Sequence, residues 1–200
     1  MSGGEGSGGE GSGGGAAGIA ALRRGLAAAW AARPPVILID GGSGAGKTTL
    51  ARALVADPAL LHGAQLLRLD DVYPGWDGLQ RASDHLVHSV LEPLSRGVAG
   101  RWQRWDWTMD AAAEWHDVDP GRPLVVEGSG ALSRASRPLV TLGAWVDLET
   151  EERRRRAIAR DGGAYEPHWD RWAAQEEAFQ RREHPRALAD VLIDGRRILA

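Results

Sequence analysis

The chain of 200 residues contains no cysteine, which excludes disulfides, thiolate metal sites and cysteine nucleophiles. It also lacks an apolar run near the ~20 residues that a membrane helix needs, and its start lacks the basic-then-apolar pattern of a signal peptide. We therefore expect a soluble protein of the cytoplasm. An excess of one charge is missing as well. The net charge of −3 comes from mixed acidic and basic residues, which favours neither nucleic acid nor a membrane surface as a partner.

The sequence divides into a short tail and one domain. Residues 1–15 repeat Gly, Ser and Glu, and such a segment has almost nothing to bury against its backbone entropy, so it predicts a disordered tail. The remaining residues, 16–200, have the length of one ordinary domain, and an apolar fraction of 43% over the chain is enough for a buried core.

Short apolar runs alternate with helical stretches along this domain. The runs predicted as strands are 36–39, 66–69, 124–126, 144–148 and 191–193, and helices are predicted over 16–32 and 83–96. This alternation predicts a parallel α/β sheet. Residues 97–123 fit neither element, and we interpret them as an irregular insertion on the substrate side, because four of the nine tryptophans lie there.

A phosphate-binding motif follows the first predicted strand. The segment GGSGAGKTT at 41–49 satisfies G-x-x-x-x-G-K-[ST] and precedes an apolar helix. A chance glycine-rich turn is the alternative, but Lys47 is the only lysine in the chain and stands where the motif needs it. The motif predicts ATP with Mg²⁺, and Thr48 as a metal ligand. The residues expected to bind ATP here are Gly41, Gly42, Ser43, Gly44, Ala45, Gly46, Lys47, Thr48 and Thr49.

Two carboxylates stand at predicted strand ends. Phosphoryl transfer needs one acid for the acceptor hydroxyl and another for the metal. Asp70 follows the second strand and is the candidate base, although the pair Asp70 and Asp71 could instead cap a turn, and the neighbouring Asp71 is not excluded as the base. Glu127 ends the third strand and is the candidate on the metal side, with a helix N-cap as the alternative.

Arginines are concentrated between residues 153 and 160. Arg153, Arg156 and Arg160 have the spacing i, i+3, i+7 and therefore lie on one helical face, ahead of two glycines. This pattern predicts a lid over the phosphates, extending from about 153 to 170. Arg153 is assigned to ATP binding, and Arg156 and Arg160 are assigned to catalysis beside Asp70 and Lys47. Arg154 and Arg155 are interpreted as a solvated basic face.

These elements together resemble the uridine kinase and phosphoribulokinase group of P-loop kinases, over roughly residues 36 to 195. An Asp-x-x-Tyr element matches Asp70 and Tyr73, and an aromatic-Asp-aromatic element matches 105–107. The pattern R-x-x-R-x-x-x-R-D matches 153–161, and the closing Ala-Asp-apolar strand matches 189–193. The resemblance implies a P-loop NTPase fold with a five-stranded parallel sheet, helices on both faces and an arginine-bearing lid.

The resemblance also implies a substrate site for a small-molecule acceptor. Where uridine kinases carry a Thr-His pair this chain has Met109 and Asp110, and the basic residue after it is absent. We therefore predict a flat, polar acceptor other than uridine, held in part by ring stacking. The residues assigned to acceptor binding are Tyr73, Trp76, Trp105, Asp106, Trp107 and Asp110.

Three other functions compete with an ATP-dependent small-molecule kinase. A motor or remodelling ATPase usually needs a larger assembly domain, whereas this chain is short and has a predicted lid. A GTPase normally reads guanine through Asn-Lys-x-Asp, which a chain with one lysine inside its P-loop does not contain. A non-catalytic ATP-binding regulatory or accessory protein is the remaining alternative, because fold alone does not define function. The oligomeric state is not determined by the sequence.

Overall fold

The computed structural model describes residues 20, 22–26 and 33–198. The predicted tail at 1–15 and most of the predicted helix at 16–32, including Trp30, lie outside these residues. Within that helix, residues 22–26 are helical, and Leu22 and Leu26 are buried.

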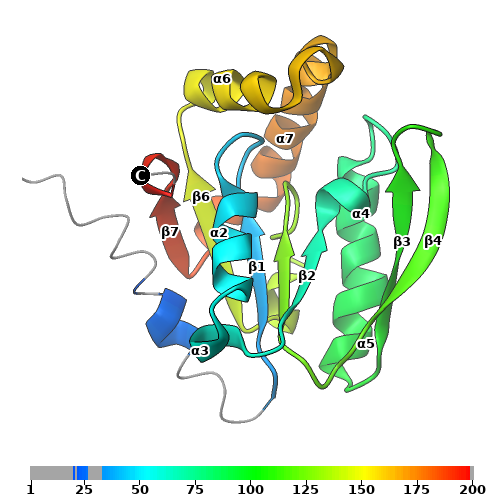
Figure 1. Cartoon of the computed structure of the whole chain (residues 1–200), viewed down its shortest axis with the longest axis vertical. Coiled ribbons are helices and arrows are strands. Elements are labelled where there is room, and N and C mark those ends of the chain that lie inside the picture. The colour runs from blue at the N-terminus through cyan, green and yellow to red at the C-terminus, as the bar shows by residue number, and fades with distance from the viewer. Residues whose placement is uncertain (1–19, 21, 27–32, 199–200) are drawn as a thin grey trace, which may run out of the picture.

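A five-stranded sheet forms the centre of the molecule (Figure 1). The strand order is β2-β5-β1-β6-β7, and every neighbouring pair is parallel. The predicted fold class is therefore confirmed. The central strand β1 is built from β-branched and apolar residues, as expected of a strand covered on both faces. The strands are β1 (Val36–Asp40), β2 (Gln65–Arg68), β5 (Leu124–Glu127), β6 (Leu142–Asp147) and β7 (Val191–Asp194).

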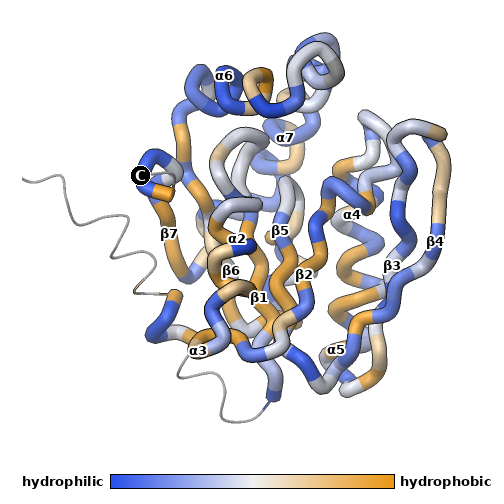
Figure 2. Tube along the Cα trace, in the orientation of Figure 1, coloured by the Kyte–Doolittle hydropathy of each residue, from blue (hydrophilic) through white to orange (hydrophobic). Residues whose placement is uncertain are grey.

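Helices cover both faces of the sheet, and two apolar cores result. Side chains of β1 alternate between them: Ile37 and Ile39 pack beneath α2 and α3, whereas Leu38 packs toward α4 and α7. Figure 2 shows the apolar strands at the centre and a largely hydrophilic α6 above them. The helices are α2 (Lys47–Val55), α3 (Pro58–Leu61), α4 (Leu79–His85), α5 (Glu92–Ser95), α6 (Thr150–Asp161), α7 (Trp169–Glu183) and α8 (Pro185–Leu188).

The helix predicted over 83–96 is confirmed, with two differences. It begins earlier, at Leu79, and a π-helical stretch at Leu86–Leu91 joins α4 to α5. The apolar side chains of this stretch, such as Leu86 and Val90, are buried in the core shared with α7. Among the helices of the described residues, none combines the length and the apolar character that a membrane crossing requires.

The prediction of an irregular segment at 97–123 is wrong. Two antiparallel strands occupy most of it, β3 (Gly100–Asp106) and β4 (Ala111–Val118), and they form a separate two-stranded sheet. The sequence does not predict this hairpin, because alanine and acidic residues are poor strand formers and because β4 has no alternation of apolar and polar residues. Pairing between the two strands and packing on a neighbouring helix overcome these weak preferences.

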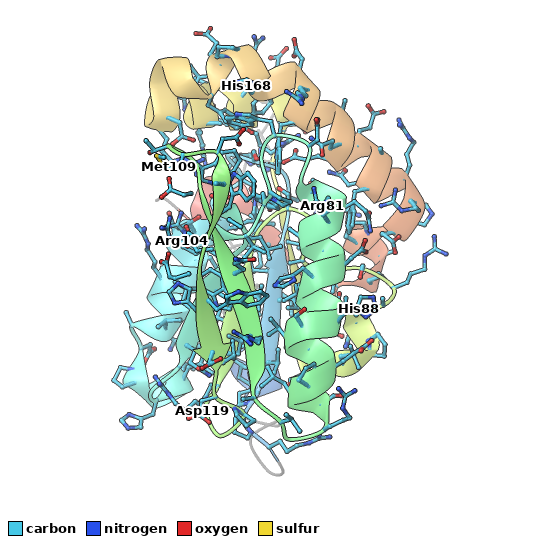
Figure 3. The ribbon with its side chains drawn as sticks, turned by 90° about the vertical axis from the view of Figure 1, so that its right-hand side faces the viewer. Arg81, His88, Arg104, Met109, Asp119 and His168 are labelled. Carbon is cyan, nitrogen blue, oxygen red and sulfur yellow. The ribbon has the colours of Figure 1, made fainter. Side chains whose placement is uncertain are left out.

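The hairpin lies against the helix that runs from α4 to α5 (Figure 3). The backbones approach closely: a Cβ added at Gly100 would lie 2.9 Å from the Val90 Cα. Trp102 packs on the core and stacks on His116 at 4.4 Å between ring centroids. Trp107 and Trp115 remain 40% and 46% exposed, so these rings are available for contacts outside the core.

A buried carboxylate connects β1 to the loop that follows β5. Asp40, the last residue of β1, accepts hydrogen bonds from the backbone N–H groups of Gly41 at 2.6 Å, Gly130 at 3.1 Å and Leu132 at 2.8 Å. Burial nevertheless raises the pKa of Asp40 to about 7, although these N–H groups and Lys47 lower it. The folded protein therefore binds a proton at Asp40 over a pH range in which the unfolded chain has released it.

This proton gives stability a defined pH dependence. A carboxyl whose pKa is raised on folding stabilises the protein below its unfolded pKa, and that contribution is lost as the pH rises to about 7. We expect the free energy of unfolding to fall by up to about 1.4 kcal/mol per pH unit between pH 5 and pH 7 from this group. Urea denaturation at several pH values should show a smaller slope in Asp40→Asn. The exposed Asp84→Asn should keep the wild-type slope, and equal slopes in all three proteins would contradict the assignment.

Candidate active site

A large cavity opens at the carboxyl end of the parallel strands, beneath α6. Its volume is about 1000 Å³, and its walls come from the loop after β1, the ends of β2 and β5, the hairpin and the segment from α6 to α7. The predicted site residues that line it are Ser43, Gly44, Gly46, Lys47, Thr48, Thr49, Asp70, Tyr73, Trp76, Trp107, Glu127, Arg156 and Arg160.

The loop between β1 and α2 has the form of a phosphate cradle. Gly46, in a left-handed conformation at φ 105°, precedes Lys47, the first residue of α2, so the positive end of this helix faces the cavity. Lys47 Nζ donates to the backbone carbonyl of Gly42 at 3.0 Å and lies 3.4 Å from Ser129 Oγ. The side chain is therefore folded back over the loop that it serves, at the place where an anion would bind.

Two oxygen-bearing side chains meet beside the cradle. Thr48 Oγ1 donates to Glu127 Oε1 at 2.8 Å, and burial raises the pKa of Glu127. Hydroxyl and carboxylate oxygens are the ligands that Mg²⁺ prefers, and a divalent cation would offset the cost of keeping Glu127 charged in a buried position. The residues present therefore fit a magnesium ion held with its water and phosphate ligands.

Both acids of the turn after β2 face the cavity. The side chains of Asp70 and Asp71 are 45% and 38% exposed, and Arg68 lies between them and Glu127, with nitrogen-to-oxygen distances of 3.8 to 4.0 Å to the three carboxylates. Burial, rather than a charge partner, is the main cause of a raised pKa at Asp71. A long cation thus stabilises three acids that would otherwise repel one another.

The arginines of α6 divide between two tasks. Arg156 donates to Glu152 Oε1 at 2.7 Å and to the Gly195 carbonyl at 3.0 Å, and its side chain is 18% exposed. Arg160 lines the cavity but pairs with Asp161 at 2.6 Å and is half exposed. Arg156 is therefore held against the end of the sheet, whereas Arg160 is paired with its neighbour in the chain at the exposed side of the cavity.

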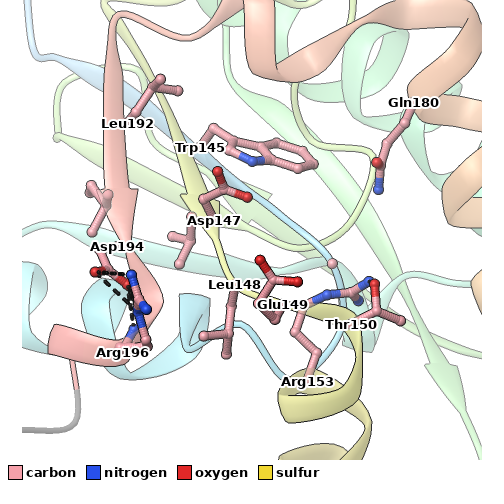
Figure 4. A pocket seen from close by; sticks show the side chains of 13 residues that line it. Trp145, Asp147, Leu148, Glu149, Thr150, Arg153, Gln180, Leu192, Asp194 and Arg196 are labelled. Carbon is pink, nitrogen blue, oxygen red and sulfur yellow. Dashed lines mark hydrogen bonds and ion pairs between the residues drawn. The ribbon is translucent and has the colours of Figure 1, made fainter.

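Arg153 lies behind the phosphate loop and does not line the large cavity. It donates to the Ser43 carbonyl at 3.2 Å and to Glu176 Oε2 at 3.1 Å. It also forms part of a second cavity of about 550 Å³, lined by residues such as Trp145 and Gln180 (Figure 4). Gly42 lines this cavity too, so the phosphate loop and Arg153 separate the two spaces.

Aromatic side chains form part of the wall of the large cavity. Trp76 stacks on His168 at 4.2 Å between ring centroids, and its ring also lies 5.1 Å from that of Trp107 and 5.5 Å from that of Tyr165. Trp107 Nε1 donates to the Asp70 carbonyl at 2.8 Å, which ties the hairpin tip to the turn that carries the candidate base. Segments far apart in sequence therefore share one aromatic wall.

Three residues assigned to the acceptor lie near this wall but are not part of it. Asp106 Oδ1 accepts the N–H groups of Thr108 and Met109 at 3.0 Å, so it holds the turn of the hairpin, and these bonds lower its pKa. The buried indole nitrogen of Trp105 has no hydrogen-bond partner among the described residues, and Asp110 adopts a left-handed conformation at φ 48° beside Gly75. None of the three lines the large cavity in the described part of the chain.

Sequence reasoning missed several residues that shape the site. Arg68 could have been found, because it directly precedes the acids at the same strand end. Glu176 carried no signal: it is 3% exposed, whereas the adjacent Glu177 is 69% exposed, and nothing in the pair of identical residues distinguishes them. Ser129 also became visible only when the loop after β5 was placed against the phosphate loop.

Two curated proteins are similar to this chain at about one third identity. A uridine kinase from Deinococcus deserti is 32% identical over 144 residues, which cover 64% of this chain and 69% of that protein. A thymidylate kinase from Gluconobacter oxydans is 31% identical over 172 residues, which cover 73% of this chain and 76% of that protein. No protein-family model matches the chain.

A solved structure supports the fold. The structure of a possible uridine kinase from Bacillus stearothermophilus superposes with a TM-score of 0.64 at 20% identity and covers 90% of this chain and 98% of its own. With the phosphate loop, the strand-end acids and the arginine helix meeting at one cavity, the sequence similarity settles the family. The chain belongs to the uridine kinase-like family of P-loop kinases, which are phosphotransferases.

Proposed function

We propose that this protein transfers the γ-phosphoryl group of ATP to a hydroxyl group of a nucleoside-like small molecule. The observation that carries the proposal is that one cavity of about 1000 Å³ contains the phosphate loop, an exposed carboxylate and three arginines of the lid helix, Arg155, Arg156 and Arg160. Phosphoryl transfer requires little covalent chemistry from a protein and depends on positioning and charge neutralisation. This set of residues supplies both.

Each group has a defined task in the transfer. The acceptor oxygen bonds to the γ-phosphorus, the bond from that phosphorus to the β,γ-bridging oxygen breaks, and ADP leaves with the electron pair. Asp70 accepts the proton of the acceptor hydroxyl, and Lys47 stabilises charge on the phosphate oxygens. Arg160 approaches the transferred group from the lid, and Arg156, fixed to the Gly195 carbonyl, supports the nucleotide from the same helix.

Thr48 and Glu127 would hold a magnesium ion next to the phosphates. When bound, the ion supplies positive charge to the phosphate oxygens and orients them. Asp70 lies on the β2 side of Arg68, and Glu127 lies on its β5 side. We assign the first carboxylate to the acceptor and the second to the metal.

The aromatic wall supports a planar acceptor. Trp76 and Trp107 line the cavity beside Asp70, and indole rings stack on flat heterocycles. The similar curated proteins are named for uridine and thymidylate, which both carry a pyrimidine ring. We therefore infer a nucleoside or nucleotide acceptor that places a hydroxyl against Asp70.

Replacement of Lys47 tests the phosphate site. Lys47→Met keeps most of the side-chain volume but removes the charge, so we expect turnover to fall at least about 10²-fold while the melting temperature changes little. Coupled ADP release and thermal unfolding measure the two effects. Thr49→Ser, which keeps the next hydroxyl in the loop, should retain most of the activity, and wild-type turnover in Lys47→Met would refute the assignment.

The two acids after β2 can be separated by kinetics. Asp70→Asn should lower kcat by about 10²-fold or more with little change in the affinity for ATP, because the proton acceptor is lost while the phosphate site remains. Asp71→Asn should have a much smaller effect on kcat. The opposite ranking would assign the role of base to Asp71, and steady-state rates at saturating ATP decide between them.

The hairpin carries two similarly exposed tryptophans, Trp107 at its tip and Trp115 in β4, and they allow a matched test of the acceptor site. Trp107→Phe should raise the KM for the acceptor several-fold and leave the KM for ATP unchanged, because Trp107, unlike Trp115, lines the cavity. Trp115→Phe alters a similarly exposed ring elsewhere on the hairpin and should change neither constant. A panel of nucleosides and nucleotides in a coupled ADP assay identifies the acceptor for these measurements. Equal effects of both substitutions would remove the hairpin tip from the acceptor site.

A further inference from the structure

The peptide groups at the start of the phosphate loop point in alternating directions. Lys47 Nζ donates to the Gly42 carbonyl at 3.0 Å, so this oxygen lies on the cavity side of the loop. In a trans peptide the N–H points opposite to the C=O, and the Ser43 N–H accordingly points away from the cavity. It donates to Glu176 Oε1 at 2.7 Å, behind the loop.

The next peptide is turned the other way. The Ser43 carbonyl accepts from Arg153 Nη1 at 3.2 Å, again behind the loop, and this turns the Gly44 N–H toward the cavity. The guanidinium lies so close to the backbone that a Cβ at Gly42 would approach Nη1 to 2.1 Å. The backbone N–H and the backbone carbonyl of Ser43 are therefore both held from the side of the loop opposite to the nucleotide.

The two side chains that hold Ser43 form a buried ion pair. Arg153 Nη1 and Glu176 Oε2 are 3.1 Å apart, and the two side chains are 12% and 3% exposed. Trp172 Nε1 donates to Glu176 Oε1 at 3.0 Å, and Ser129 Oγ donates to the same oxygen at 2.8 Å. Both carboxylate oxygens of Glu176 therefore accept hydrogen bonds. Because the pair is neutral as a whole, its effect on the phosphates comes from geometry rather than from net charge.

We propose that Glu176 and Arg153 are positioning residues that hold the phosphate loop in its anion-binding conformation. Glu176 comes from α7 and Arg153 from α6, so two helices late in the chain set the direction of peptide groups in a loop that follows β1. The Gly42 carbonyl is also held by Lys47 Nζ and by the Ala45 N–H, whereas the Ser43 carbonyl is held by Arg153. Without the clamp, the peptide between Ser43 and Gly44 therefore loses its anchor behind the loop and can turn, so that the Gly44 N–H no longer faces a bound phosphate. The proposal rests on the proposed function only in taking ATP as the ligand.

Direct binding measurements test the clamp without any acceptor. In Glu176→Gln the side-chain oxygen still accepts the Ser43 N–H, but the charge that holds Arg153 is gone. We expect the Kd for a non-hydrolysable ATP analogue with Mg²⁺, measured by calorimetry, to rise about 10-fold or more. The Kd for adenosine, which has no phosphate, should not change. Glu177→Gln removes the neighbouring charge on the solvent side of the same helix and should leave both constants unchanged.

Arg153→Met provides a second variant of the same clamp, and it serves if Glu176→Gln does not fold. Arg153→Met should also raise the Kd for the ATP analogue about 10-fold or more. Because both residues belong to one clamp, the rise in Kd in the double variant should be much smaller than the product of the two single rises. Unchanged affinity for the analogue in a folded single variant overturns the proposal, as does an equal loss for adenosine. A failure of the kinase assignment would instead leave these binding constants as predicted and remove only the acceptor-dependent release of ADP.

Discussion

The site depends on how the peptide groups of the phosphate loop are held in place. A loop that binds an anion must direct N–H groups inward, and each outward-facing polar group then needs a partner of its own. Asp40 accepts a hydrogen bond from the Gly41 N–H, and Glu176 accepts one from the Ser43 N–H. Arg153 donates one to the Ser43 carbonyl. These contacts, which come from the protein itself, give the cradle its shape.

The parallel sheet brings the remaining chemistry to the same place. Strands that run in one direction end at one edge, so Asp40, Asp70 and Glu127, which follow or end three different strands, converge around the loop. Arg68 and Lys47 compensate the negative charge that this convergence creates. Burial raises the pKa of Glu127, and the proposed magnesium ion would offset the cost of keeping this carboxylate charged.

The acceptor side is assembled differently, from segments that are distant in the sequence. The loop after β2 contributes Trp76, the hairpin contributes Trp107, and the turns between α6 and α7 contribute Tyr165 and His168. The hydrogen bond from Trp107 to the Asp70 carbonyl links this wall to the candidate base. The proposed acceptor wall and the candidate base thus meet at one turn, and a change in the hairpin can affect both.

The sequence by itself determined the parts of this protein whose chemistry is local. The phosphate loop, the acids at the strand ends, the arginine spacing of α6 and the apolar runs of the sheet each follow from residues within a short window, where backbone preference and side-chain type suffice. The family resemblance could be stated from the same motifs. Two glycines, one lysine and one threonine at defined spacing require little context to be interpreted.

Tertiary structure alone decided the features that depend on distant partners. The strands of the hairpin exist because they pair with each other and pack on Val90, not because alanine and glutamate prefer extended backbone. Glu176 differs from Glu177 only in the direction that it faces on α7, and that direction was set by the packing of the helix on the sheet. The placement of Asp106 in a turn, rather than in the cavity, likewise followed from where the hairpin closes. Burial and long-range pairing are properties of the folded chain, and a short stretch of sequence does not predict them.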